Sequence, residues 1–347
     1  MLAGAYAAAG PRTPPESFLP APLGLLGEQT IALTDLVAFV QHPVRAFLRQ
    51  RLGLSLRTDD ERPADALAVE LDTLEAWGVG DRLLRSLLSG GDMDAICAAE
   101  VARGLLPPGA LGSTALAQAR AKAQAIADAA VGIAAGDRSS LEVDIGLSGG
   151  RRLVGTVSEV VGEVVRPTTF SNLRAKQRLA AWVHFLAVSA AHPDRPLSSA
   201  TIGWGRGGPT VMQLSPLGPT PQDRSARAME LLATVVDLRD AGLREPLPLY
   251  CATSHRYASA VRSGSEFPEE DAADYWTSGY KWDKEDKEAE HVLVLGGVRT
   301  FAEVLAARPA PEECGPGWAT TEATRFGRLA RRLWDPVLDA AAAGPPK

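Results

Sequence analysis

The stretch LTDLVAFVQHPVRAFLRQRLGLSL, residues 33–56, has the pattern of an amphipathic helix with a proline in its middle. Thr34 is placed to act as the N-cap, and Asp35 falls in the first turn. The apolar residues recur at helical spacing and predict one buried face; they are Val40, Val44, Phe47 and Leu48.

Pro43 interrupts this helix. A proline in a helix interior lacks the N–H that would bond to the carbonyl of Phe39, so the helix bends or restarts there. We expect the bend to let Phe39 and Phe47 pack on the same core from two segments. His42–Pro43 is therefore interpreted as a structural joint.

The composition is typical of a soluble globular protein, since 46% of the 347 residues are hydrophobic and 22% are charged. The net charge of −6 predicts no nucleic-acid binding by the molecule as a whole, although local basic patches could still bind it. Three dispersed cysteines exclude a disulfide framework and indicate a reducing compartment, which favours a cytoplasmic protein. The sequence has no apolar run long enough to cross a membrane.

The chain divides by composition. Residues 1–30 are rich in proline and predict a linker or a disordered lead, and residues 341–347 predict a disordered tail. Between them we expect one domain over residues 31–340. Its helical part spans residues 31–138, and a sheet with flanking helices spans residues 139–340.

Local signals refine this division. Residues 59–63 predict a loop, and Gly78 and the pair Gly90–Gly91 predict breaks between helices. Residues 140–166 are short, β-branched segments that predict three consecutive antiparallel strands. The pattern as a whole predicts an α+β fold, in which a small, mostly antiparallel sheet is flanked by many helices.

The sequence lacks the common motifs of nucleotide and zinc binding. It contains no G-x-x-x-x-G-K-[ST] loop, and GWGRGG at 203–208 fits a glycine-rich strand edge because no helix start follows it. The five histidines are scattered and none pairs with a cysteine, so a structural zinc site is not expected. We predict no cofactor.

Four segments carry a family resemblance. They are LTDLVAFVQHPVRAFLRQRLGLSL, then ELDTLEAWGVGDRLLRSLLSG, then GTVSEVV leading to NLRAKQRLAAWVHFLAVSAAHP, and finally RFGRLARRLWDPVL. The first contains the H/C-P-x-x-x-F-x-x-x-R-L pattern of nuclease-fold domains in the RecB/AddB group of recombination enzymes. Together, in this order, they resemble the C-terminal domain family of RecC, the gamma subunit of exodeoxyribonuclease V. The resemblance covers about residues 30–340. His42 stands where some relatives have an iron–sulphur cysteine, and three dispersed cysteines do not suffice for such a cluster.

The resemblance implies a PD-(D/E)xK nuclease-like fold. Active members hold Mg²⁺ with an Asp on one strand and a D/E-x-K on the next, because carboxylates bind the metal and the lysine helps to activate water. Here Ser158 stands at the Asp position, and the next strand offers Val164 and Arg166. A serine is a poor Mg²⁺ ligand, so the catalytic residues are lost and no metal site is expected.

An active Mg²⁺-dependent DNA exonuclease is the alternative, because several acids lie in or near these strands. They are Glu142, Asp144, Glu159 and Glu163. Gly162 turns the chain between the last two, so strand alternation does not place them on one face. Exposed carboxylates at strand ends are the simpler interpretation.

The resemblance implies a role within a heterotrimeric RecBCD-type helicase–nuclease of double-strand break repair. There the domain would scaffold a RecB-like beta subunit and a RecD-like alpha subunit and help to bind and split double-stranded DNA ends. The motors and the nuclease would reside in those partners. A fragment without independent function is a further alternative, since helicase-like domains are absent from this chain.

Basic residues offer phosphate contacts. The candidates are Arg45, Arg49, Arg151, Arg152, Arg174, Lys176 and Arg178, with Arg51 in the opening helix and Arg325, Arg328, Arg331 and Arg332 in the last one. For any one of these arginines a solvated face with internal salt bridges is the alternative.

An aromatic and acidic segment lies near residue 280. Its aromatic residues could stack on unpaired bases; they are Tyr275, Trp276, Tyr280 and Trp282. Five acids follow between residues 283 and 290 and would repel phosphates. We therefore favour an exposed loop that docks a partner protein, with DNA contact as the alternative.

Overall fold

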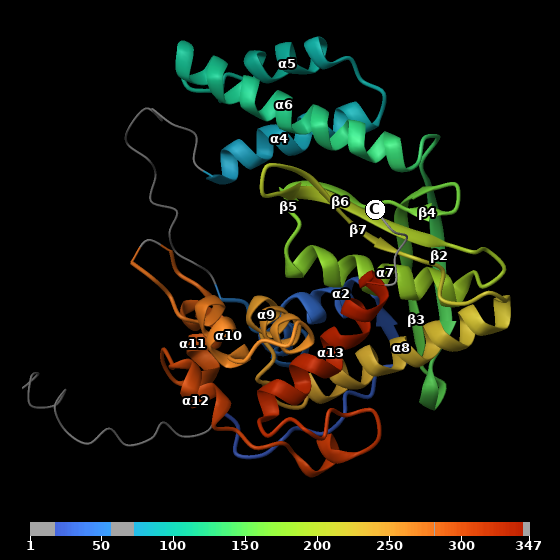
Figure 1. Cartoon of the computed structure of the whole chain (residues 1–347), viewed down its shortest axis with the longest axis vertical. Coiled ribbons are helices and arrows are strands. Elements are labelled where there is room, and N and C mark those ends of the chain that lie inside the picture. Colours follow the sequence, from blue (N-terminus) through green and yellow to red (C-terminus); the bar gives the residue numbers. More distant parts are fainter. Residues whose placement is uncertain (1–17, 57–72, 281, 343–347) are drawn as a thin grey trace, which may run out of the picture.

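The structure, a computed structural model, describes residues 18–56, 73–280 and 282–342 (Figure 1). A mixed sheet of seven strands lies at its centre. The strands are β1 (Thr30–Ala32), β2 (Ser139–Gly146), β3 (Arg152–Val161), β4 (Val164–Val165), β5 (Thr168–Asn172), β6 (Ser198–Gly205) and β7 (Gly208–Leu214).

The antiparallel meander predicted over residues 140–166 is confirmed as β2, β3 and β4. GWGRGG lies at a strand edge, as predicted, and forms the turn of the hairpin between β6 and β7. The sheet is mixed but mostly antiparallel, as predicted: the two long ladders, β2 with β3 and β6 with β7, are antiparallel, whereas the parallel pairings of β1 with β3, and of β4 and β5 with β6, are short. The third predicted strand is divided at Pro167, which has no N–H to continue a ladder.

Helices cover both faces of the sheet (Figure 1). They are α2 (Leu33–Gln41), α3 (Pro43–Ala46), the π-helix η1 (Phe47–Arg51), α4 (Thr73–Leu88), α5 (Met93–Ala102), α6 (Ala110–Ile133), α7 (Ala175–Ala191), α8 (Pro221–Gly242), α9 (Cys251–Arg262), α10 (Pro268–Trp276), α11 (Ala289–Leu295), α12 (Phe301–Leu305) and α13 (Arg325–Ala342). The α+β class is thus confirmed. None of the helices in the described ranges is long and apolar enough to span a membrane.

Three hydrophobic cores organise these layers. The sheet core lies between the strands and α7, with α2 and α8 beyond, and includes Leu153 and Trp182. The lobe core lies on the opposite face, where the helical lobe of α4, α5 and α6 covers β5 and β6, with Phe170 at its centre. The C-terminal core joins α9, α10, α12 and α13 around Tyr250 and Trp276.

The helical part predicted over residues 31–138 therefore contains helices from both faces of the sheet. α2 packs against α7 in the sheet core, whereas α4, α5 and α6 form the lobe. The boundary at residue 138 coincides with the start of β2, but it does not separate two packed bodies.

The N-terminal lead is attached where the structure describes it. From residue 18 onward it runs along the body, because Glu28 forms an ion pair with the buried Arg239 and the N–H of Leu23 donates to the carbonyl of Arg244 at 2.9 Å. The rest of the proline-rich lead, residues 1–17, lies outside the described residues. So do the predicted loop at 59–63 and residues 343–347 of the predicted tail, while residues 341–342 continue α13.

Two local predictions were wrong. Helix α2 begins at Leu33 directly after β1, so the cap position falls on Ala32, and Thr34 lies inside the helix. Gly78 does not break a helix, because α4 runs through it to Leu88. The break predicted at Gly90–Gly91 is confirmed.

Candidate functional site

The joint at His42–Pro43 divides the opening helix as the sequence predicted. His42 has non-helical backbone angles (φ −162°, ψ 81°), and Pro43 is the first residue of α3. The Nδ1 of His42 accepts a hydrogen bond from the backbone N–H of Arg45 at 3.1 Å, so the imidazole caps the new helix. The joint lies where two cores meet, since Phe39 belongs to the sheet core and Val44 to the C-terminal core.

Phe47 is as deeply buried as Phe39. Its ring lies 6.2 Å from the ring of Phe18, so it covers the described end of the N-terminal lead. Burying a phenylalanine side chain stabilises a fold by roughly 2–3 kcal/mol. The joint therefore directs two large rings into the protein from helices that no longer share an axis.

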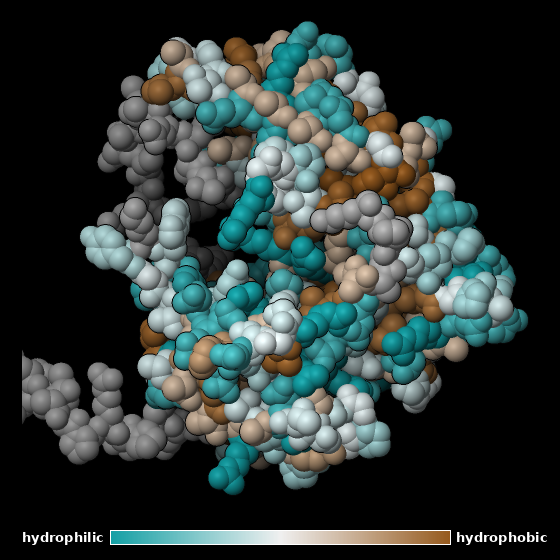
Figure 2. Space-filling view, viewed as in Figure 1, coloured by the Kyte–Doolittle hydropathy of each residue, from teal (hydrophilic) through white to brown (hydrophobic). Residues whose placement is uncertain are grey.

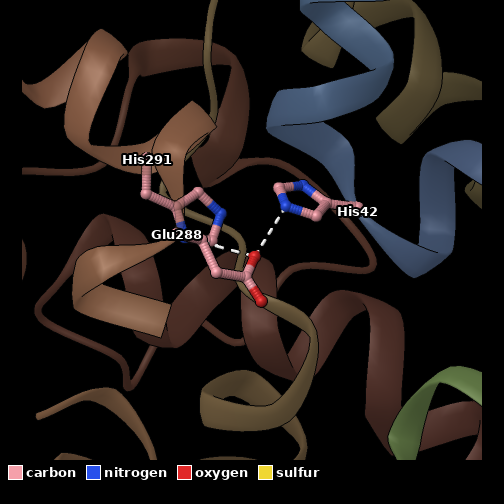
Figure 3. A group of neighbouring side chains, drawn as sticks. All are labelled: His42, Glu288 and His291. Carbon is pink, nitrogen blue, oxygen red and sulfur yellow. Dashed lines mark ion pairs between the residues drawn. The ribbon is translucent and has the colours of Figure 1, made fainter. Parts of the chain in front are cut away.

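His42 also belongs to a buried cluster with Glu288 and His291 (Figure 3). Its Nε2 lies 2.6 Å from Oε2 of Glu288. The Nδ1 of His291 is 3.8 Å from the same oxygen, and the two imidazole rings are 4.7 Å apart. Sequence reasoning missed this cluster, although Glu288 and His291 have the i, i+3 spacing of one helical face.

The surroundings of the cluster set its protonation. Burial alone raises the pKa of Glu288, but the hydrogen bond and charge of His42, with His291 and Lys176 nearby, lower that pKa to about 2. Burial, followed by the charge of His42, lowers the pKa of His291 to about 4. At neutral pH the cluster therefore combines an ionised carboxylate with an uncharged imidazole at position 291.

Two imidazoles and a carboxylate are a possible ligand set for a transition metal. The hydrogen bond from Arg45 opposes this reading, because a ring nitrogen that accepts an N–H carries no proton. In the neutral ring of His42 the proton is then on Nε2, which faces Glu288. A metal on Nε2 would have to displace that proton and disturb the helix cap. The cluster is better described as a proton-bearing link between α3 and α11.

β3, the strand that carries the predicted degenerate position Ser158, is irregular near this residue. Ser158 is exposed on β3, and the next residue, Glu159, has a positive φ of 67°. The register between β2 and β3 shifts opposite this point, which marks a β-bulge. Val164 is half-buried and pairs with Val161.

Arg166 is buried, with 3% of its surface exposed. Its guanidinium donates to the carbonyl oxygen of Ala130 at 2.9 Å and to that of Ala134, so it caps the C-terminal end of α6. Burial lowers the pKa of Arg166. This side chain faces the helical lobe and is committed to a structural role there.

The four acids near these strands do not converge. Asp144 pairs with Arg152, Glu159 with Arg138, and Glu163 with Arg195, while Glu142 is exposed. Among the described residues, the one group of three or more side chains close enough to hold a metal is His42, Glu288 and His291. Three of the four strand acids are therefore each neutralised by a separate arginine.

Nine of the twelve predicted phosphate contacts are already engaged, six of them in ion pairs and three with backbone carbonyls. Arg45 pairs with Glu290 at 2.6 Å, Arg151 with Asp240 at 2.8 Å, Arg152 with Asp144, and Lys176 with Glu288 at 3.9 Å. In the last helix, Arg325 and Arg331 pair with acids, Arg328 donates to two backbone carbonyls, and Arg332 donates to the carbonyl of Gly317. Arg51 donates to the carbonyl of Gly24.

Three of the predicted basic residues have neither an ion pair nor a backbone carbonyl as partner of the guanidinium in the described part of the chain. Arg49 and Arg174 are exposed, and Arg178 is half-buried. Burial lowers the pKa of Arg178. These three are the predicted contacts whose charge is still available to an anion.

The aromatic segment near residue 280 differs from the prediction in two respects. Trp276 is fully buried in the C-terminal core, with its Nε1 donating to the carbonyl of Arg299 at 2.7 Å, so it is not available to stack on bases. Three acids of the run, Glu285, Asp286 and Glu290, are buried as well. Glu285 accepts the N–H groups of Ala252 and Thr253 at the start of α9, so it caps that helix. Tyr275, Tyr280 and Trp282 are exposed, as predicted.

Comparison with known proteins gives the family. The RecC C-terminal domain family matches residues 28–262. This chain belongs to that family. It is 37% identical over 339 residues to the RecBCD enzyme subunit RecC of Mycobacterium tuberculosis, and 37% identical over 340 residues to that of Mycolicibacterium smegmatis. Each alignment covers 98% of this chain and 30% of the relative.

A more distant RecC has a shorter match. The RecBCD enzyme subunit RecC of Escherichia coli is 27% identical over 170 residues, or 49% of this chain and 15% of the relative. The chain therefore spans less than a third of the length of these RecC proteins. The family assignment from the four segments is confirmed.

Proposed function

We propose that this chain is a non-catalytic gamma-subunit portion of a cytoplasmic RecBCD-type complex in recombinational repair. It would scaffold a RecB-like beta subunit and a RecD-like alpha subunit, and help to bind and split double-stranded DNA ends. Membership of the RecC C-terminal domain family supports the complex, because the relatives are named as subunits of the RecBCD enzyme.

A PD-(D/E)xK nuclease-like fold is part of this proposal. Its support is the order of elements: α2, the antiparallel strands β2, β3 and β4, the crossover helix α7, and then β6 parallel to β4. Ser158 lies on β3 and Arg166 directly follows β4, which supports their assignment to the positions where the family resemblance expects the residues that bind metal and activate water.

The observation that carries the loss of catalysis is Arg166. Its guanidinium caps α6 and cannot also meet a metal-bound water beside Ser158. Ser158 provides no charge for a cation, and Asp144 and Glu159 are already paired with arginines. The Mg²⁺ site of active relatives does not fit the residues present, so no catalytic step is assigned.

Incubation of the purified chain with linear double-stranded DNA and Mg²⁺ tests this part. We expect no cleavage above a buffer control. Cleavage that disappears with Glu159→Gln or Asp144→Asn would instead identify an active nuclease built on the strand acids.

The second part of the test is assembly. The chain and separately purified RecB-like and RecD-like subunits from the same organism should co-elute in size-exclusion chromatography. Failure to associate with either subunit would favour a fragment without independent function. Binding to double-stranded DNA ends is measured in parallel by fluorescence anisotropy over a range of salt concentrations.

A further inference from the structure

The exposed aromatic side chains of this chain are concentrated in one place. The described residues include five aromatic side chains that are more than a third exposed, and four of them lie between residues 267 and 282. They are Phe267 (59% exposed), Tyr275 (48%), Tyr280 (104%) and Trp282 (75%). The loop between α10 and α11 that carries the last two projects from the body of the molecule (Figure 1), and its side chains extend beyond the surface around them (Figure 2).

This loop is fastened at its base by a buried carboxylate. Asp286 is 5% exposed and accepts the backbone N–H of Ser278 at 3.1 Å, together with the Ser278 hydroxyl. The same hydroxyl accepts the N–H of Lys284 at 2.8 Å. The N–H of Gly279 also donates to the carbonyl of Trp282 at 3.1 Å, which closes the turn. The buried part of the acidic run thus positions the loop.

A fixed loop that presents large rings to water suits a binding surface. Tyrosine and tryptophan contribute much contact area with few torsions to order, and they are enriched among the residues that dominate protein interfaces. Because the base of the loop is already ordered, binding would cost less conformational entropy than it would for a flexible segment. Isolated exposed apolar side chains are ordinary on a surface, but four aromatic ones in one segment are not.

The charges around these rings decide between nucleic acid and protein. Five exposed acids share the segment, namely Glu266, Glu269, Glu270, Asp274 and Asp283. Two lysines that follow in the described part of the segment are engaged, since Lys287 pairs with Asp283 at 2.7 Å and the Lys284 ammonium donates to the carbonyl of Asp274. Proteins that bind single strands combine stacking rings with a positive groove that follows the phosphates. The opposite charge here disfavours a nucleic acid.

We propose that residues 266–280 together with Trp282 and Asp283, the acidic–aromatic patch, dock a protein whose surface offers an apolar cleft edged by lysine or arginine side chains. This inference rests on the proposed function, because it takes that protein to be one of the two partner subunits of the complex. Tyr280 and Trp282 enter the cleft, and the exposed acids meet its basic edge. The basic edge also steers association, so binding weakens as salt rises.

Two variants of the patch test the proposal. Tyr280→Ser with Trp282→Ser removes the rings, and Glu266→Lys with Asp274→Lys reverses two charges outside the first turn of α10. All four side chains are exposed, so the fold should be retained, which circular dichroism melting checks. The matched control is Val101→Ser with Leu105→Ser, which removes two apolar side chains of similar exposure from the helical lobe.

The measurement is the affinity of each form of the chain for the purified RecB-like and RecD-like subunits, and for single-stranded and double-stranded DNA. We expect each patch variant to weaken binding to one subunit by about tenfold or more, as hot-spot residues do, while the lobe control binds like the wild type. DNA affinity should be unaffected by the loss of the rings.

The outcomes separate this proposal from the proposed function. If the wild type binds a subunit and the patch variants bind it equally well, the patch proposal is wrong and the proposed function stands. If the wild type binds neither subunit, both are wrong. If loss of the rings weakens DNA binding and leaves subunit binding intact, the patch contacts nucleic acid and the protein-docking proposal is overturned.

Discussion

The cluster of His42, Glu288 and His291 predicts a specific loss of stability in acid. The pKa of His291 falls from the ordinary 6.5 to about 4 because the ring is buried and lies beside His42. Between pH 6.5 and 4 the unfolded chain therefore binds a proton at this position that the folded chain does not. The free energy of unfolding should decrease across this window, and the difference in pKa corresponds to about 3 kcal/mol.

Glu288 contributes over a different range. Its pKa is lowered to about 2, so the stability that it provides is complete above pH 4.5 and is lost as the pH falls from 4.5 toward 2. The two groups thus act in sequence on acidification. The part between pH 6.5 and 4.5 belongs to the histidine and can be measured before the carboxylate titrates.

The variant His291→Asn isolates this effect. An asparagine amide can keep the hydrogen bond that Nδ1 of His291 makes to the carbonyl of Glu285 at 2.6 Å, but it does not titrate. It loses the ring that packs between Tyr250 and Trp276, so we expect it to be less stable at pH 7 by about 1–3 kcal/mol.

Urea unfolding followed by tryptophan fluorescence, repeated from pH 7 to pH 4, measures both effects. The wild type should lose about 3 kcal/mol more than His291→Asn over this range. His192→Asn, which removes a histidine at the end of α7, is the matched control and should follow the wild type. Parallel curves for the wild type and His291→Asn would refute the reasoning.

Three further predictions concern other parts of the molecule. Arg166→Met should destabilise the fold by about 2–3 kcal/mol, because two carbonyls at the end of α6 lose their buried donor, and thermal unfolding measures it. Gly242→Ala should cost about 1–3 kcal/mol, because a Cβ there would collide with the ring of Phe39; the urea midpoint should fall accordingly. Arg49→Ala should weaken DNA binding and reduce its salt slope by about 1, whereas Arg152→Ala, whose charge is already paired, should change both less.

Local chemistry made part of the fold predictable. A proline inside a helix ends or restarts it, as Pro43 does here. The β-branched segments around Gly149 and Gly162 predict strands and turns from local sequence alone. The α+β class and the family assignment followed from these elements and their order. In such regions the local sequence is sufficient to predict the secondary structure.

Burial determined the rest, and burial depends on residues far away in the chain. The sequence does not distinguish Trp276 from its neighbours Tyr275 and Tyr280. Trp276 is buried because the rings of Tyr250, His291 and Phe301 pack around it. The sequence predicts that the acids Glu285 and Asp286 are exposed to solvent. Instead Glu285 caps α9, and Asp286 fixes the base of the loop between α10 and α11. A carboxylate is expected to be exposed unless a donor meets it, and a sequence does not indicate where those donors lie.

The candidate site follows the same division. The family resemblance proposed Ser158 and Arg166 as degenerate nuclease positions, but the role of Arg166 as a helix cap could not be predicted from the sequence. The pairing of His42 with Glu288 joins residues that are more than two hundred positions apart. Spacing along a chain predicts which side chains are neighbours on one helix or strand, but it does not predict contacts between distant segments.

The position of Arg166 also bears on how the protein opens. The lobe core and the sheet core lie on opposite faces of one sheet. The helical lobe can therefore detach locally from the sheet without exposing the side chains that pack against α7. Arg166 opposes this local opening, because it directly follows β4 and its guanidinium donates to carbonyls at the end of α6. Amide exchange should therefore show a hierarchy within one domain, in which α6 opens at a lower free energy than α7. Loss of the guanidinium should accelerate amide exchange in the helical lobe alone, because this side chain holds the lobe to the sheet.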